Sequence, residues 1–138
     1  MEKPEIICMC GSTKFADLMA AISWEFEKRS KIVLRVNYVP EWYVVGAKWN
    51  ENHHGAEQDG LKEQLDTLHC RKIDLCDRVY VCNYDNYIGE STRNEINYAI
   101  SVGKPIMYLC GDEQNEMSET AHKLIGWCIS WYKEKITK

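Results

Sequence analysis

Glu95 is a carboxylate in an unusual position for a surface helix. It lies beside an apolar stripe that we predict from Ile96, Ala99 and Ile100, one turn into a helix. A carboxylate there would point toward the place where α/β proteins bind ligands, which favours a functional role. The other interpretation is a partly exposed Glu that the positive helix N-terminus stabilises.

His69 is the second side chain that could do chemistry. It lies between Leu65 and Ile73, within an apolar stripe of a predicted helix over Glu57–Cys76. A single His on an apolar face is commonly a hydrogen-bonded core residue. It is nonetheless the titratable residue of this helix best placed to face a sheet, and its ordinary pKa suits proton transfer. The predicted inner stripe consists of Leu61, Leu65, Leu68, Lys72 and Cys76, with Asp66 toward solvent.

A short polar turn, Gly11-Ser12-Thr13-Lys14, joins a predicted strand to a predicted helix. The strand is the apolar run Glu5–Cys10, which we expect to be central because it is apolar on both faces. The backbone N–H groups and hydroxyls of such a turn suit a phosphate or a sugar oxygen. Alternatively, Ser12 or Thr13 only caps the helix. The predicted apolar helix positions are Phe15, Leu18, Met19, Ile22 and Phe26.

The segment Asp77–Leu109 predicts the unit that positions Glu95. It reads as a strand, a polar loop, a helix capped by Ser91, a tight turn at Gly103 and a second strand. The predicted bounds are Arg78–Asn83, Tyr84–Glu90, Ser91 to about Val102, and Ile106–Cys110.

The remaining pattern completes an α/β domain. Lys31–Tyr38 predicts another strand and Ser118–Lys135 a last helix, whose Trp127 and Trp131 suit a dimer patch or the core rim. We predict a single domain over residues 1–138, with four or five mostly parallel strands and helices on both faces. This is a doubly wound, Rossmann-like fold. Its topology predicts that Gly11–Lys14, Tyr84–Glu90 and Glu95 line one crevice.

Residues 40–60 form a long segment with no clean period. Its aromatic side chains could stack on a planar base, cover the sheet edge or make a subunit contact. The sequence does not separate Trp42, Tyr43 and Trp49 for the stacking role.

Composition limits the class of protein. The chain has 138 residues and a net charge of −4, which gives no support for a nucleic-acid polymer or an anionic membrane as partner. No apolar run approaches the roughly 20 residues of a membrane span, and the first residues do not resemble a signal peptide, so we expect a cytoplasmic protein.

The seven cysteines, with no C-x-x-C pair, indicate buried free thiols in a reducing compartment. A metal site built from Cys8, Cys10 and His53 or His54 is conceivable, but C-x-C without a second pair is weak support. We therefore predict no metal and no cofactor.

Two runs resemble a known family. A Cys-Gly-Ser-Thr-Lys turn over residues 10–14 and the run from Asp77 to Ile106 resemble the nucleoside 2-deoxyribosyltransferases. The branch most similar is the 2′-deoxynucleoside 5′-phosphate N-hydrolases. The resemblance covers about two thirds of the chain and implies a flavodoxin-like fold that cleaves N-glycosidic bonds, by hydrolysis or by base transfer.

The resemblance also implies residue roles. Glu95 matches the Glu that attacks C1′ of the sugar or stabilises positive charge there. Gly11, Ser12, Thr13, Lys14 and Ser91 match the positions that hold the 5′-phosphate of a nucleotide, and Asn83, Tyr84 and Trp42 are the expected contacts to the rest of the substrate.

Two positions depart from the family pattern. Cys8 stands where the family usually has Tyr, and His69 stands where it has an Asp that transfers protons with the Glu. His69 could protonate the departing base or activate water. If it does not, the chain could bind a nucleotide without cleaving it.

Three other functions therefore stay open: an inactive nucleotide-sensing module, an NAD-type glycohydrolase and a structural adaptor. The partner expected is a small nucleoside or nucleotide, and the resemblance implies at least a homodimer.

Overall fold

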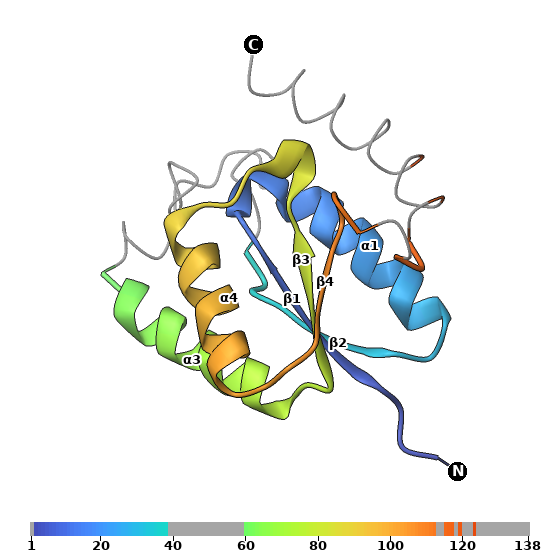
Figure 1. Cartoon of the computed structure of the whole chain (residues 1–138), viewed down its shortest axis with the longest axis horizontal. Helices are drawn as coiled ribbons and strands as arrows, with labels where there is room; N and C mark the ends of the chain where they lie inside the picture. Colours follow the sequence, from blue (N-terminus) through green and yellow to red (C-terminus); the bar gives the residue numbers. More distant parts are fainter. Residues whose placement is uncertain (1, 39–59, 113–114, 118, 120–122, 124–138) are drawn as a thin grey trace, which may run out of the picture.

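The structure is a computed structural model that describes residues 2–38, 60–112, 115–117, 119 and 123. Its sheet has four parallel strands in the order β2-β1-β3-β4 (Figure 1). The strands are β1 Ile6–Gly11, β2 Ile32–Leu34, β3 Arg78–Cys82 and β4 Ile106–Tyr108. The helices are α1 Ala16–Lys28, α3 Lys62–Leu75 and α4 Glu90–Ser101, with 3₁₀ turns η1 Thr13–Phe15 and η3 Tyr84–Asn86.

The two central strands are β1 and β3. Cys8 pairs with Leu34 of β2 on one side and with Val79 of β3 on the other. Four consecutive β1 residues, 7–10, are at most 1% exposed, which confirms the prediction of a central strand. The edge strands are shorter than predicted, since β2 ends at Leu34 and β4 at Tyr108.

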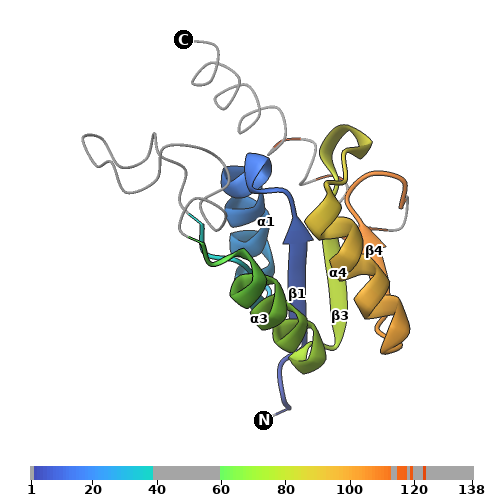
Figure 2. The same cartoon turned by 90° about the vertical axis from the view of Figure 1, so that its left-hand side faces the viewer.

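Helices cover both faces of the sheet. Helix α1 lies on one face, and α3 and α4 lie side by side on the other (Figures 1 and 2). Alternate residues of β1 divide between them: Ile7 and Met9 join the α1 core, whereas Cys8 and Cys10 join the α3–α4 core. This architecture is compatible with a Rossmann-like fold.

The predicted apolar face of α1 is confirmed, because Phe15, Leu18, Met19, Ile22 and Phe26 are all buried. The predicted stripes of α3 and α4 are partly wrong. Leu61 and Leu68 are 43% and 48% exposed, and Ile100 is 62% exposed. The inner face of α3 is rotated toward His69 and Ile73, and that of α4 toward Thr92, Ile96 and Ala99. Each helix therefore buries a narrower stripe than its apolar residues suggest.

Helix α4 begins before the predicted cap. Its N-cap is Gly89, so Ser91 lies inside the first turn and does not cap the helix. The turn after α4 matches the prediction, since Gly103 has a φ of 76°, a conformation that favours glycine.

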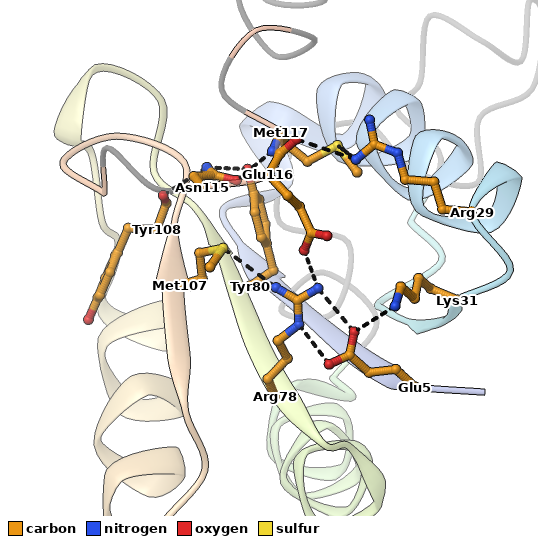
Figure 3. Close-up of polar contacts among 10 residues, drawn as sticks. All are labelled: Glu5, Arg29, Lys31, Arg78, Tyr80, Met107, Tyr108, Asn115, Glu116 and Met117. Carbon is orange, nitrogen blue, oxygen red and sulfur yellow. Dashed lines mark hydrogen bonds and ion pairs between the residues drawn. The ribbon is translucent and has the colours of Figure 1, made fainter. Parts of the chain in front are cut away.

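A polar cluster closes the α1 face at the start of β3 (Figure 3). Arg78 donates two hydrogen bonds of 3.1 Å to Glu5 and forms an ion pair with Glu116. Lys31 also pairs with Glu5, at 3.3 Å. We call Glu5, Lys31, Arg78 and Glu116 the Arg78 cluster; it ties the start of β1 to the segment after β4.

Asn115, which precedes Glu116, forms several hydrogen bonds in the same region. Asn115 donates to the Tyr80 hydroxyl at 2.9 Å and to the Tyr108 carbonyl at 3.0 Å, and it accepts from the Met117 backbone N–H (Figure 3). Met117 is fully buried. Among the described residues, no helix is both long and apolar enough to span a membrane.

Several sequence predictions lie outside the described residues. They are the stacking aromatics Trp42, Tyr43 and Trp49, the pair His53 and His54, and most of the helix predicted over Ser118–Lys135.

Candidate functional site

Four polar side chains meet on the α3–α4 face of the sheet. The Nε2 atom of His69 lies 3.1 Å from Glu95 Oε2, 3.3 Å from Cys10 Sγ and 3.6 Å from Cys8 Sγ. We call Cys8, Cys10, His69 and Glu95 the His69 cluster. It combines two thiols, an imidazole and a carboxylate around one nitrogen atom.

Three elements supply this cluster. Cys8 and Cys10 are two residues apart in β1, so both point to the same face of the sheet. His69 comes from the inner face of α3, and Glu95 from the margin of α4. His69 is 3% exposed and Glu95 keeps 13% of its side chain exposed, so Glu95 is the member through which a ligand could reach the cluster.

The cluster lies beside the carboxyl-terminal half of β1. From β1 the chain continues to β2 on one side, and from β3 it continues to β4 on the other. Parallel α/β sheets bind their ligands at the carboxyl ends of two such neighbouring strands. The position of the cluster therefore suits a ligand site.

Burial and mutual contacts shift the pKa values of all four groups. Burial raises the pKa of Glu95 to about 7, against the opposing charge of His69. Burial disfavours the charged form of His69, but hydrogen bonding to Cys8 and the charge of Glu95 raise its pKa overall. The hydrogen bond with Cys10 lowers the pKa of Cys8 to about 6, and the same contact, with burial, raises that of Cys10. With pKa values of about 6 and about 7, Cys8 and Glu95 therefore titrate near neutral pH, whereas Cys10 keeps its proton.

The turn after β1 is held close to β3. A Cβ atom on Gly11 would lie 2.9 Å from Met19 Sδ and 3.1 Å from the Cys82 carbonyl oxygen, so only glycine fits without a shift. The Ser12 hydroxyl accepts a hydrogen bond from the Lys14 backbone N–H at 3.2 Å, which caps η1. Helix α1 starts only at Ala16, one short turn later than the predicted cap implies.

The loop after β3 lies against this turn. The Lys14 ammonium group is 4.3 Å from the centre of the Tyr87 ring, a cation–π contact. Phe15 makes edge-to-face contacts with the rings of Tyr84 and Tyr87, at 5.8 and 6.1 Å between centroids. The predicted meeting of residues 11–14 with the Tyr84–Glu90 loop is therefore seen, and Tyr87 is a contact that the sequence did not single out.

The side chain of Asn83, an expected substrate contact, forms hydrogen bonds within the protein. It is 4% exposed, and its amide pairs with both backbone groups of Cys110: Nδ2 donates to the carbonyl at 3.1 Å, and Oδ1 accepts from the N–H at 2.9 Å. This side chain joins the end of β3 to the end of β4.

Ser91 has a cationic neighbour that sequence reasoning missed. Lys62 Nζ donates to the Ser91 hydroxyl at 2.7 Å and pairs with Asp66 at 3.3 Å. The contact depends on α3 packing beside α4 and spans 29 residues, so no local pattern could indicate it. Along the helix, Ser91 lies one turn before Glu95.

The structure thus brings together Glu95 and His69, and separately Lys14 with the loop after β3 and Ser91 with Lys62. Cys8 and Cys10 were missed as partners of His69, although their spacing in a strand was the available signal. Trp42 lies outside the described residues. Within the described part of the chain, the thiols of Cys8 and Cys10 and a ring nitrogen of His69 all lie within 4.8 Å of one another, close enough to share a metal ion.

Comparisons of the chain with models of protein families, with curated proteins and with solved structures gave no match.

Proposed function

We propose that this protein cleaves the N-glycosidic bond of a nucleoside or nucleoside 5′-monophosphate, with Glu95 at C1′ and His69 as its proton-transfer partner. The observation that supports this most directly is the 3.1 Å contact between Glu95 Oε2 and His69 Nε2 beside the carboxyl-terminal half of β1. Carboxylate and imidazole are the group types that glycosidic cleavage requires, one for the sugar cation and one for the proton.

Glu95 would act on the sugar. Cleavage of a glycosidic bond develops positive charge on C1′, and a carboxylate beside that carbon stabilises it or attacks it to form a covalent intermediate. Burial of Glu95 away from water raises its pKa to about 7. In such surroundings the attraction between carboxylate and sugar cation is stronger than in water.

His69 would move the proton. It is held against Glu95 from the neighbouring helix and is 3% exposed, so its ring is positioned before substrate binds. A protonated His69 donates to the departing base, and the neutral form then accepts a proton from the attacking water. A second base in place of water would make the reaction a transfer.

The phosphate and base would lie on either side of this pair. Gly11–Lys14 directly follows Cys10 of the His69 cluster, and its ammonium group suits a phosphate. Ser91 with Lys62 is a second hydroxyl–cation pair on the side of α4. Tyr84 and Tyr87 could stack on the base, and Trp42 is a third candidate.

The same proposal includes the finer fold assignment. Strand order 2-1-3-4 is consistent with a doubly wound, flavodoxin-like single domain related to the nucleoside 2-deoxyribosyltransferases. We also propose a cytoplasmic homo-oligomer in which a neighbouring subunit completes the substrate site.

The test measures the release of free base by chromatography. The reduced protein, with a chelator, is incubated with ribo- and deoxyribonucleoside monophosphates, nucleosides and NAD. We expect release from one substrate class, and Glu95→Ala should lower its rate by about 10³-fold. His69→Gln should lower it by about 10²-fold or more. Glu63→Gln, which changes an exposed carboxylate of α3, is the matched control and should keep the rate.

Each result separates the alternatives. Release from NAD alone indicates a glycohydrolase of that cofactor. Binding of a monophosphate without release from any compound indicates a sensing module and overturns the proposal. Equal rates for Glu95→Ala and the wild type would exclude Glu95 from the chemistry.

A further inference from the structure

The His69 cluster places three polar atoms around one ring nitrogen. Three atoms, Glu95 Oε2, Cys10 Sγ and Cys8 Sγ, lie 3.1–3.6 Å from the single nitrogen Nε2 of His69. That nitrogen carries at most one proton, so it can donate only one of these contacts. The other ring nitrogen, Nδ1, is buried and has no hydrogen-bond partner among the described residues. Hydrogen bonding alone therefore leaves the cluster incompletely satisfied.

The spacing of three of these atoms, Cys8 Sγ, Cys10 Sγ and His69 Nε2, fits a tetrahedral metal ion, and Glu95 lies beside His69. With Zn–S bonds near 2.3 Å and Zn–N or Zn–O bonds near 2.1 Å, neighbouring ligand atoms around zinc are about 3.3–3.8 Å apart. The distances from His69 Nε2 to Cys10 Sγ and Cys8 Sγ, 3.3 and 3.6 Å, fall in this range, and Glu95 Oε2 at 3.1 Å is just below it. The Cys8 and Cys10 sulfur atoms are within 4.8 Å of each other, so a small movement brings them and His69 onto one ion, and Glu95 would turn its side chain to become the fourth ligand.

We propose that Cys8, Cys10 and His69 bind one Zn²⁺ ion and that Glu95 turns in as its fourth ligand. Thiolate and imidazole ligands bind zinc in preference to magnesium or calcium, which take oxygen ligands. Cys8 and Cys10 come from one rigid central strand, and His69 and Glu95 from two helices packed on it. On binding, the protons still held by the two thiols and by the Glu95 carboxyl leave to solvent, and the ring proton moves to or stays on Nδ1 so that the Nε2 lone pair faces the metal.

Zinc binding would also affect the proposed activity. This effect rests on the proposed function, whereas the zinc site itself does not. Zinc would take the carboxylate of Glu95 and the Nε2 lone pair of His69, the two groups proposed to act on the sugar and the base. The zinc-bound protein would then be inactive until the metal is removed. The positive charge of Lys72 acts to lower the pKa values of Cys8 and His69, and it offsets part of the negative charge of the metal-free ligands.

The experiment measures metal binding without using activity. Co²⁺ is titrated into the reduced, metal-free full-length chain, and the optical spectrum is followed; Zn²⁺ then displaces the Co²⁺ in competition. We expect one equivalent to bind, with thiolate-to-cobalt charge-transfer bands in the near ultraviolet and the visible bands of a tetrahedral ion. Cys8→Ser and Cys10→Ser should weaken Zn²⁺ binding by more than the roughly 10–100-fold that loss of an outer hydrogen-bond partner costs a metal site.

The matched control is Cys110→Ser, which changes a half-buried thiol outside the cluster and should bind as the wild type does. Thermal unfolding of each metal-free variant shows whether it folds, and the wild-type spectrum tests the site even if one variant does not. Absence of thiolate-to-cobalt bands in the wild type, or unchanged binding in both cluster variants, would overturn the zinc site. A protein that binds zinc but releases no base retains the site and fails only the proposed function.

Discussion

The two polar clusters on opposite faces of the sheet are built differently. In the Arg78 cluster, the cations Arg78 and Lys31 meet the carboxylates of Glu5 and Glu116, so positive and negative charges match in number (Figure 3). In the His69 cluster, one ring nitrogen lies close to two thiol sulfur atoms and a carboxyl oxygen. The charges of the first cluster balance, whereas in the second His69 Nδ1 has no hydrogen-bond partner among the described residues.

The difference separates structure from function. A satisfied ionic network at the edge of the core holds segments together and needs nothing further. A buried group of titratable side chains with incomplete hydrogen bonding is stable only because the surrounding fold holds it, and such groups are commonly functional. The same sheet therefore supports a structural cluster on the α1 face and a candidate reactive cluster on the α3–α4 face.

The largest expected effect on stability is from Arg78→Met. Its removal leaves Glu5 and Glu116 without their shared cation, and we expect the free energy of unfolding to fall by about 2–3 kcal/mol. Urea unfolding at pH 7 measures this. The matched control is Arg71→Met, which breaks the exposed pair with Asp74 and should cost about 0.5 kcal/mol. Equal losses in the two variants would show that the Arg78 cluster is no more than a surface ion pair.

A smaller effect of opposite sign is expected from Glu95→Gln in metal-free protein. Because the folded-state pKa of Glu95 is raised from 4.5 to about 7, the wild type should lose stability as pH rises between these values. Besides His69 and Cys8, the charged groups near Glu95 are Asp66 and Lys62. The variant carries no such charge and should be more stable than the wild type at pH 8, by about 2 kcal/mol.

This prediction is checked by urea unfolding at several pH values with a chelator present. A stability curve for Glu95→Gln that runs parallel to that of the wild type between pH 5 and 8 would rule out an ionised, buried Glu95 as the cause.

Glu5→Gln should show the opposite pH dependence. Burial acts to raise the pKa of Glu5, but Arg78 and Lys31 lower it overall. Its contribution to stability is therefore present above its unfolded pKa and is lost as pH falls through its folded pKa. We expect the variant to lose about 1 kcal/mol at pH 7 and to approach the wild type at acid pH, measured in the same unfolding series. A loss that is the same at pH 3 and pH 7 would contradict an electrostatic origin.

The smallest effect is expected from Lys31→Met. Its pair with Glu5 is 3.3 Å long and 30% of its side chain is exposed, so solvent screens it. Thermal unfolding should change by an amount corresponding to about 0.5 kcal/mol or less. A loss as large as that of Arg78→Met would mean that the cluster depends on total charge and not on the guanidinium hydrogen bonds.

Sequence patterns predicted the parts of the fold that depend on one element at a time. The apolar run that forms β1 and the regular spacing from Phe15 to Phe26 were strong enough to give a central strand and the buried face of α1. The predictions were wrong for Leu68 and Ile100, because a helix pattern leaves the buried face uncertain by about one residue. In the packed structure His69 is buried against the sheet and Leu68 is exposed.

The candidate site was only partly predictable for the same reason. Glu95 and His69 could be singled out as chemically unusual, but their contact depends on how α3 and α4 pack on the sheet. A metal site of Cys8 and Cys10 with His53 or His54 was considered from the sequence, but no metal was predicted. The structure instead brings His69 to the two thiols from about 60 residues away, and those two histidines lie outside the described residues.

The pairing of Asn83 with Cys110 also has a consequence for local opening of the fold. Leu109 donates its backbone N–H to Val81 at 2.9 Å, and the Asn83 side chain then takes the place of one further strand residue opposite Cys110. The amide proton of Cys110 is therefore held as a sheet amide would be, beyond the end of β4. In hydrogen exchange it should exchange together with the amides of β4, so that the loop after β3 and the chain after β4 open as one unit.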